Sequence, residues 1–132
     1  MPALVIALLS CVLHLGCRAV ETIWSAQAVS PDGYWLATAK TELHGGFGTA
    51  GVVTSVYLKR TNGSSPAVEI LGFFHDARDV SNTINLTMNW TTPTHLDVTY
   101  NGRAGVDLQV VKFAGVEISL RVLSAKTTDS PR

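Results

Sequence analysis

The sequence predicts an all-β fold: a single antiparallel sandwich, or a strongly twisted and partly closed sheet, of about seven or eight strands after an N-terminal signal segment. Apolar and polar residues alternate along most of the second half of the chain, which is the period of a strand. Turn-forming Gly, Pro, Asn and Asp residues separate these segments, and none combines helical periodicity with capping residues. With 132 residues, 46% of them hydrophobic, the chain is long enough for one domain around one core.

The first segment is the apolar run 3–16, which only Ser10 and His14 interrupt. It is shorter than the roughly 18–20 apolar residues of a membrane-spanning helix and has the length of a signal-peptide core. We therefore expect residues 1–16 to be a signal peptide, 17–29 an anchor, linker and first strand, 30–125 the all-β domain, and 126–132 a flexible tail.

Leu15-Gly16-Cys17 closes the apolar run and resembles the lipobox of bacterial lipoprotein precursors, in which a small residue precedes a cysteine that is lipidated and becomes the new N-terminus. The resemblance implies lipidation of Cys17 and attachment to the periplasmic side of a bacterial membrane. Cleavage after Ala19 or Ala28 is one alternative, which would give a soluble periplasmic or secreted domain, and an N-terminus that is not cleaved is another. Cys11 and Cys17 are the only cysteines, so the chain beyond Cys17 cannot form an internal disulfide.

The strands are expected in order along the rest of the chain. The turn Ser30-Pro31-Asp32-Gly33 joins the first two, because Pro31 presets its φ angle and Gly33 tolerates a positive one. A glycine-rich loop at 44–51, a turn at 62–66 and a polar connection at 75–83 separate the next ones. The predicted strands are 22–29, 34–42, 52–60, 67–74, 84–90, 96–100, 106–110 and 116–122.

Two hairpins have the clearest patterns. One joins 84–90 to 96–100 through the turn at 91–94, and the other joins 106–110 to 116–122 through Ala114-Gly115. In the first hairpin Ile84, Leu86, Met88 and Trp90 share one face and are expected in the core. The opposite face carries short polar side chains that could bind a sugar or a peptide, or form only the wet side of a half-buried sheet: Asn85, Thr87, Asn89, Asp97, Thr99 and Asn101.

The chain shows no catalytic constellation, so we expect a protein that is not an enzyme and carries no cofactor or metal. Ten basic residues balance ten acidic ones, which leaves no basic field for nucleic acid. The alternative is a metal-binding or small-ligand-binding protein, or an enzyme, that uses the loop at 75–79. Its candidate ligands are His75, Asp76 and Asp79, with His44 from the glycine-rich loop.

The segment SPDGYWLATAK, from Ser30 on, resembles the opening of small, mostly uncharacterised bacterial exported proteins, in which this turn starts the first good strand after a lipoprotein signal. The resemblance implies a location more than an activity. We therefore expect a membrane-anchored lipoprotein that acts as a non-enzymatic binding or structural module of the cell envelope. Its expected partners are the membrane, through Cys17, and an envelope protein; the oligomeric state stays open.

Overall fold

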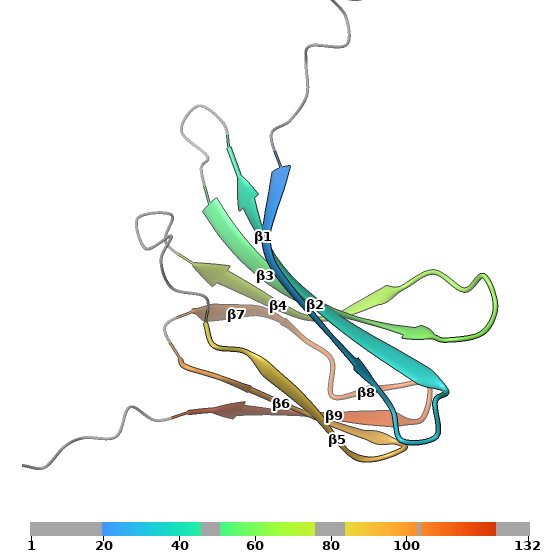
Figure 1. Ribbon diagram of the computed structural model, residues 1–132. Helices are drawn as coiled ribbons and strands as arrows, with labels where there is room; N and C mark the ends of the chain where they lie inside the picture. Colours follow the sequence, from blue (N-terminus) through green and yellow to red (C-terminus); the bar gives the residue numbers. More distant parts are fainter. Residues whose placement is uncertain (1–19, 46–50, 76–83, 103, 124–132) are drawn as a thin grey trace, which may run out of the picture.

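The computed structural model describes residues 20–45, 51–75, 84–102 and 104–123, without the side chain of His75 (Figure 1). These residues form strands and turns and no helix, so none of them belongs to a helix long and apolar enough to cross a membrane. The all-β class predicted from the sequence is confirmed. The strands are β1 (Val20–Val29), β2 (Trp35–His44), β3 (Gly51–Arg60), β4 (Val68–His75), β5 (Thr87–Thr92), β6 (His95–Tyr100), β7 (Gly105–Gln109), β8 (Lys112–Phe113) and β9 (Val116–Val122).

The strands form two sheets that face each other (Figure 1). The first sheet has the order β1-β2-β3-β4-β7, and the second has the order β5-β6-β9-β8. Neither sheet closes on itself, so of the two predicted architectures the sandwich is the one found. Neighbouring strands are antiparallel except β6 and β9, which are parallel.

The predicted hairpin between 106–110 and 116–122 is wrong. β7 pairs with β4 in the first sheet, whereas β9 pairs with β6 and β8 in the second. The turn at Ala114-Gly115 exists, with φ angles of 47° and 84°, but it connects the two-residue strand β8 to β9. Positive φ at both central residues is the geometry of a tight hairpin, so the local signal was correct. The alternation of 106–110 gave no information on its partner strand, because alternation shows which face is buried and not which strand lies beside it.

The core lies between the two sheets and is built by the alternating inward residues of both. Three of the contacts between the sheets involve aromatic side chains. The Trp35 ring in β2 meets Phe113 in β8 edge-on with centroids 6.5 Å apart, and Phe73 in β4 lies 4.8 Å from Tyr100 in β6. The Trp90 indole in β5 donates a hydrogen bond of 3.1 Å to the carbonyl of Ala28 in β1. The buried cluster consists of Trp35, Ala37, Ala39, Val56, Leu58, Ile70, Leu71, Phe73, Ile84, Leu86, Leu96, Val98, Tyr100, Ala104, Val116 and Ile118.

β5 begins at Thr87 and not at Ile84 as predicted. Asn85 has a φ angle of 47°, in the left-handed region, which interrupts the extended backbone. Ile84 and Leu86 are nevertheless buried, and Met88 and Trp90 pack against the same core, so the predicted inward face is correct.

The turn between β1 and β2 forms as predicted and is held by two side chains. Gly33 has a φ angle of 73°, and its amide donates to the carbonyl of Ser30 at 2.8 Å. The Ser30 hydroxyl donates to Asp32 Oδ1 at 2.6 Å and accepts the amide of Trp35 at 2.9 Å. The hydrogen bond from Ser30, together with the amide of Tyr34, lowers the pKa of Asp32 below its ordinary value of 3.8. This turn fixes the start of β2 and hence the inward position of Trp35.

Candidate functional site

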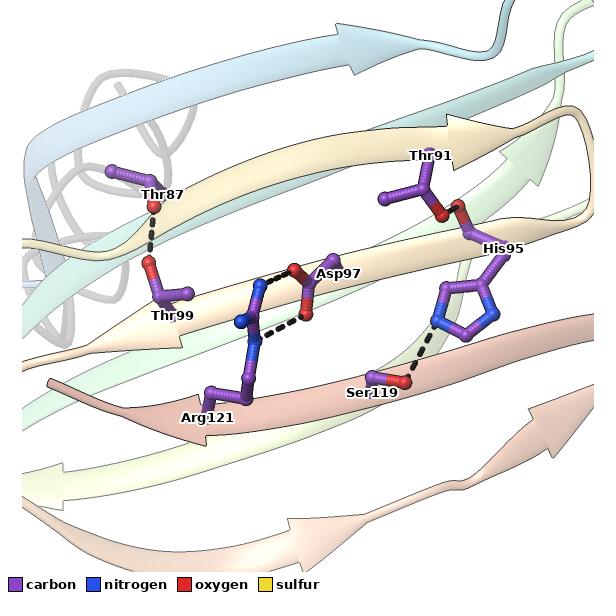
Figure 2. A network of polar contacts seen from close by, with 7 residues as sticks. All are labelled: Thr87, Thr91, His95, Asp97, Thr99, Ser119 and Arg121. Carbon is purple, nitrogen blue, oxygen red and sulfur yellow. Dashed lines mark hydrogen bonds and ion pairs between the residues drawn. The ribbon is translucent and has the colours of Figure 1, made fainter.

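The outer face of the second sheet carries a polar network over β5, β6 and β9 (Figure 2). In the antiparallel pair β5–β6, Thr87 lies opposite Thr99 and Asn89 opposite Asp97. The parallel pair β6–β9 places Asp97 beside Ser119. Since successive side chains alternate, these polar residues point outward while Leu96, Val98 and Ile118 fill the core. We call this surface the polar face; it consists of Thr87, Asn89, Thr91, His95, Asp97, Thr99, Glu117, Ser119 and Arg121.

Asp97 and Arg121 form the centre of the polar face. Arg121 Nε donates to Asp97 Oδ1 at 3.2 Å and its Nη2 donates to Oδ2, so the guanidinium and the carboxylate form a bidentate ion pair (Figure 2). The Asp97 side chain is 9% exposed and that of Arg121 is 67% exposed. The hydrogen bond and charge of Asp97 raise the pKa of Arg121, which keeps the guanidinium charged. The two-point geometry limits the freedom of the Arg121 head group and holds it on this face.

His95 occupies the next position along β6 and touches β9. Its Nε2 lies 2.8 Å from Ser119 Oγ, and its Nδ1 lies 3.6 Å from Glu117 Oε2. Hydroxyl, imidazole and carboxylate thus follow one another in the order that a serine nucleophile requires.

Acyl transfer also requires hydrogen-bond donors for the oxyanion, usually free backbone N–H groups near the nucleophile. Beside Ser119 the amides are already used: Glu117 donates to the carbonyl of Thr94 at 2.8 Å, and Ile118 to that of Val111 at 2.9 Å. The arrangement therefore orients the imidazole and the hydroxyl toward each other, and neither of these two amides is left to donate to an oxyanion.

Threonine hydroxyls complete the network (Figure 2). The hydroxyls of Thr87 and Thr99 share a hydrogen bond across β5 and β6, and Thr91 Oγ1 donates to the carbonyl of His95 at 3.4 Å. Hydrogen bonds thus orient most side chains of this face relative to one another, and pre-orientation of this kind lowers the entropic cost of binding.

The structure brings together four of the six polar residues predicted from the sequence, namely Thr87, Asn89, Asp97 and Thr99. Asn85 and Asn101 lie just outside the strands, at the start of β5 and the end of β6, where the amide of Asn101 donates to the carbonyl of Ile84 at 2.9 Å. The prediction omitted Thr91, His95, Glu117, Ser119 and Arg121. The last three alternate with Val116, Ile118 and Leu120, so the sequence did carry a signal for their outward position. It carried none for the parallel pairing that sets them beside β6.

The residues considered for metal binding do not form a site in the described part of the chain. His44 ends β2, and its Nε2 lies 3.6 Å from Glu42 Oε2. His75 ends β4 opposite Val52, while Asp76 and Asp79 lie outside the described residues, as does Cys17. Among residues 20–45, 51–75, 84–102 and 104–123, no three His, Cys, Asp or Glu side chains are grouped to hold a metal ion.

Comparison with protein-family models, with curated proteins and with solved structures finds no match to this chain.

Proposed function

We propose that this protein is an exported bacterial lipoprotein, anchored through an acylated Cys17, whose β-sandwich is a non-enzymatic module that binds an envelope protein through the polar face. The anchor is supported by the apolar run 3–16 and by Leu15-Gly16-Cys17, which resembles a lipobox. The single observation that carries the binding role is the pre-oriented network around Asp97 and Arg121, on a face with no role in the core.

The polar face suits a protein partner better than a glycan. Sugar-binding surfaces commonly stack an aromatic ring on the sugar, but the aromatic ring of β5, Trp90, belongs to the inward face and packs on the core. The polar face instead presents an exposed arginine and short hydrogen-bonding side chains, and arginine is enriched among residues that dominate protein interfaces. The non-enzymatic role is supported by the engaged amides next to Ser119.

Intact-mass spectrometry of the full chain produced in a bacterial host tests the anchor. We expect a species that starts at Cys17 and carries a diacylglyceryl group, lost in Cys17→Ser and retained in the matched control Cys11→Ser. An unmodified chain that starts near Val20 or Val29 would overturn the lipoprotein proposal and leave the binding role to be tested alone.

Site-specific photo-cross-linking in the same host tests the binding role. A photoreactive residue at Asn89, exposed on the polar face, should give a discrete protein adduct, and Arg121→Glu should abolish it. The control position is Gln27, which is exposed on the first sheet. Equal adducts at Asn89 and Gln27, or an adduct that survives Arg121→Glu, would contradict binding through the polar face.

A further inference from the structure

A small pocket of about 210 Å³ lies between the start of β2, the end of β3, Ser65 and Pro66 of the β3–β4 loop, and the β8–β9 turn. Leu58 and Trp35 line it from the first sheet, and both are buried. Phe113 lines it from the second sheet, and its ring contacts that of Trp35 edge-on. The pocket thus has an apolar wall built by both sheets. It is separate from the polar face and independent of the anchor.

One cation, Arg60, lies at this wall: it pairs with Trp35 in the register of β2 and β3 and shares its face, whereas the neighbouring Lys59 pairs with Leu36 on the opposite face. The Arg60 guanidinium lies 5.2 Å from the centroid of the Tyr34 ring and 5.4 Å from that of Trp35, and its Nη1 donates to the Tyr34 hydroxyl at 2.8 Å. A guanidinium has five N–H donors, so most of them stay available after this one contact. The two rings hold the guanidinium in place, because cation–π contacts favour this stacked position.

Arg60 has no acidic partner among the described residues. The ion pairs there join Lys40 to Glu42, His44 to Glu42, His95 to Glu117 and Arg121 to Asp97, and none involves Arg60. A positive charge without an acidic partner at the rim of an apolar wall complements a ligand with one negative end and one apolar end.

We propose that this pocket binds the carboxylate of a small acid with an aromatic or large apolar body, the carboxylate against Arg60 and the body against Trp35 and Phe113. A planar guanidinium matches a carboxylate through two parallel hydrogen bonds. The volume is below the roughly 300–1,000 Å³ of pockets for drug-sized ligands, so one ring or one side chain fits. Such a group occurs both as a free arylalkanoic acid and as the C-terminal residue of a peptide chain.

Titration of the full chain with phenylacetate, followed in proton–nitrogen correlation spectra, tests the proposal. The indole N–H signal of Trp35, assigned by Trp35→Phe, should shift with saturation, while those of Trp24 and Trp90 should stay in place. Phenylacetamide, which has the same body without the charge, should not bind measurably. Equal binding of phenylacetamide would overturn the role of the positive charge of Arg60.

Arg60→Gln removes the charge and keeps most of the side-chain stem. We expect it to weaken phenylacetate binding about tenfold, which corresponds to ~1.4 kcal/mol, and Arg60→Lys to restore part of the loss. The matched control is Lys112→Gln, which removes one positive charge from the exposed β8 residue next to Phe113 and should leave the affinity nearly unchanged. Unchanged affinity in Arg60→Gln, or an equal loss in Lys112→Gln, would refute the assignment of Arg60.

A second series separates the two sources of the ligand. A short peptide that ends in Phe with a free carboxylate is compared with the same peptide amidated at its C-terminus. Binding of the free peptide that amidation abolishes identifies a chain end as the ligand, whereas binding of phenylacetate but of neither peptide identifies a free acid. If neither phenylacetate nor the free peptide moves the Trp35 signal, the pocket does not bind carboxylates and the proposal is wrong.

Discussion

Phe73 and Phe74 are adjacent on β4 and provide a direct test of which face of the first sheet is the core. Phe73 is 0% exposed and contacts Tyr100 of the other sheet, whereas Phe74 is 52% exposed. The two residues have the same side chain and the same strand, and they differ in the face they occupy. Replacing each of them by alanine is the same chemical change, so the difference in stability between the two variants shows which face of β4 is buried.

Phe73→Ala should lower the free energy of unfolding by about 3–5 kcal/mol, through lost apolar burial and the cavity that remains. Natural domains unfold with about 5–15 kcal/mol, so this single change removes a large part of the stability. Phe74→Ala should cost about 1 kcal/mol, because only half of its ring leaves water on folding. At ~4 °C or more per kcal/mol for a domain of this size, the melting temperature of Phe73→Ala should fall by roughly 12 °C or more.

Urea unfolding followed by tryptophan fluorescence measures both variants, with an unchanged denaturant slope as the condition for comparing them. Phe73→Leu is the control for cavity size and should cost less than Phe73→Ala. A cost of Phe74→Ala equal to or above that of Phe73→Ala would refute the reasoning. It would mean that β4 is shifted by one residue, which exchanges every inward and outward side chain.

Three other changes have definite outcomes. Thr54→Val should lower the free energy of unfolding by about 1–3 kcal/mol, because it removes the side-chain partner of the buried Thr41 hydroxyl, 2.7 Å away; a neutral result in urea unfolding would exclude this hydrogen bond. The pKa of Asp32 is lower in the folded state than its ordinary value of 3.8. The ionised carboxylate therefore stabilises the folded state above pH 3.8, and this contribution is lost as the pH falls through the lowered pKa. Asp32→Asn should therefore reduce stability at neutral pH and make little difference in strong acid, and a difference that persists in acid would contradict this. Ser119 should not react with a fluorophosphonate, because the amides of Glu117 and Ile118 that precede it already donate to other carbonyls, and labelling that His95→Ala abolishes would instead reveal an acyl-transfer enzyme.

Local features of this fold were predictable and long-range pairings were not. Pro31 and Gly33 predict the turn because each sets or permits a backbone angle by its own structure. The inward direction of Met88 and Trp90 follows from two-residue alternation. The pairing of β7 with β4 joins segments about 35 residues apart. Whether β7 pairs with β4 or with β9 depends on how the two sheets pack around the core. No neighbouring residue encodes that choice.

In the polar face too, the contacts within a hairpin were predictable and the long-range contacts were not. Thr87, Asn89, Asp97 and Thr99 could be predicted because they face one another across a hairpin with a short turn. Arg121 reaches Asp97 only because β9 lies parallel to β6, an arrangement in which the intervening chain passes through the other sheet. The burial of the Asp97 carboxylate is a consequence of that neighbour. The sequence pattern predicts that both side chains point outward from their strands, but it does not predict that β6 and β9 bring them into contact.

The position of β1 connects the two proposals. Two residues separate Cys17 from Val20, the first residue of β1, so an acylated Cys17 would hold that end of the strand within about 10 Å of the anchor. β1 then runs for 10 residues, about 33 Å, to the turn that precedes Trp35. If Cys17 carries the lipid, the pocket with Trp35 and Arg60 is as far from the attachment point as β1 allows.

A domain that points away from the membrane would leave this pocket open to solutes, and one that tilts onto the membrane would bring it toward the headgroups. Anionic vesicles that block the Trp35 shift of the lipidated chain, and not that of Cys17→Ser, would establish the tilted arrangement, and an unaffected shift would establish the upright one.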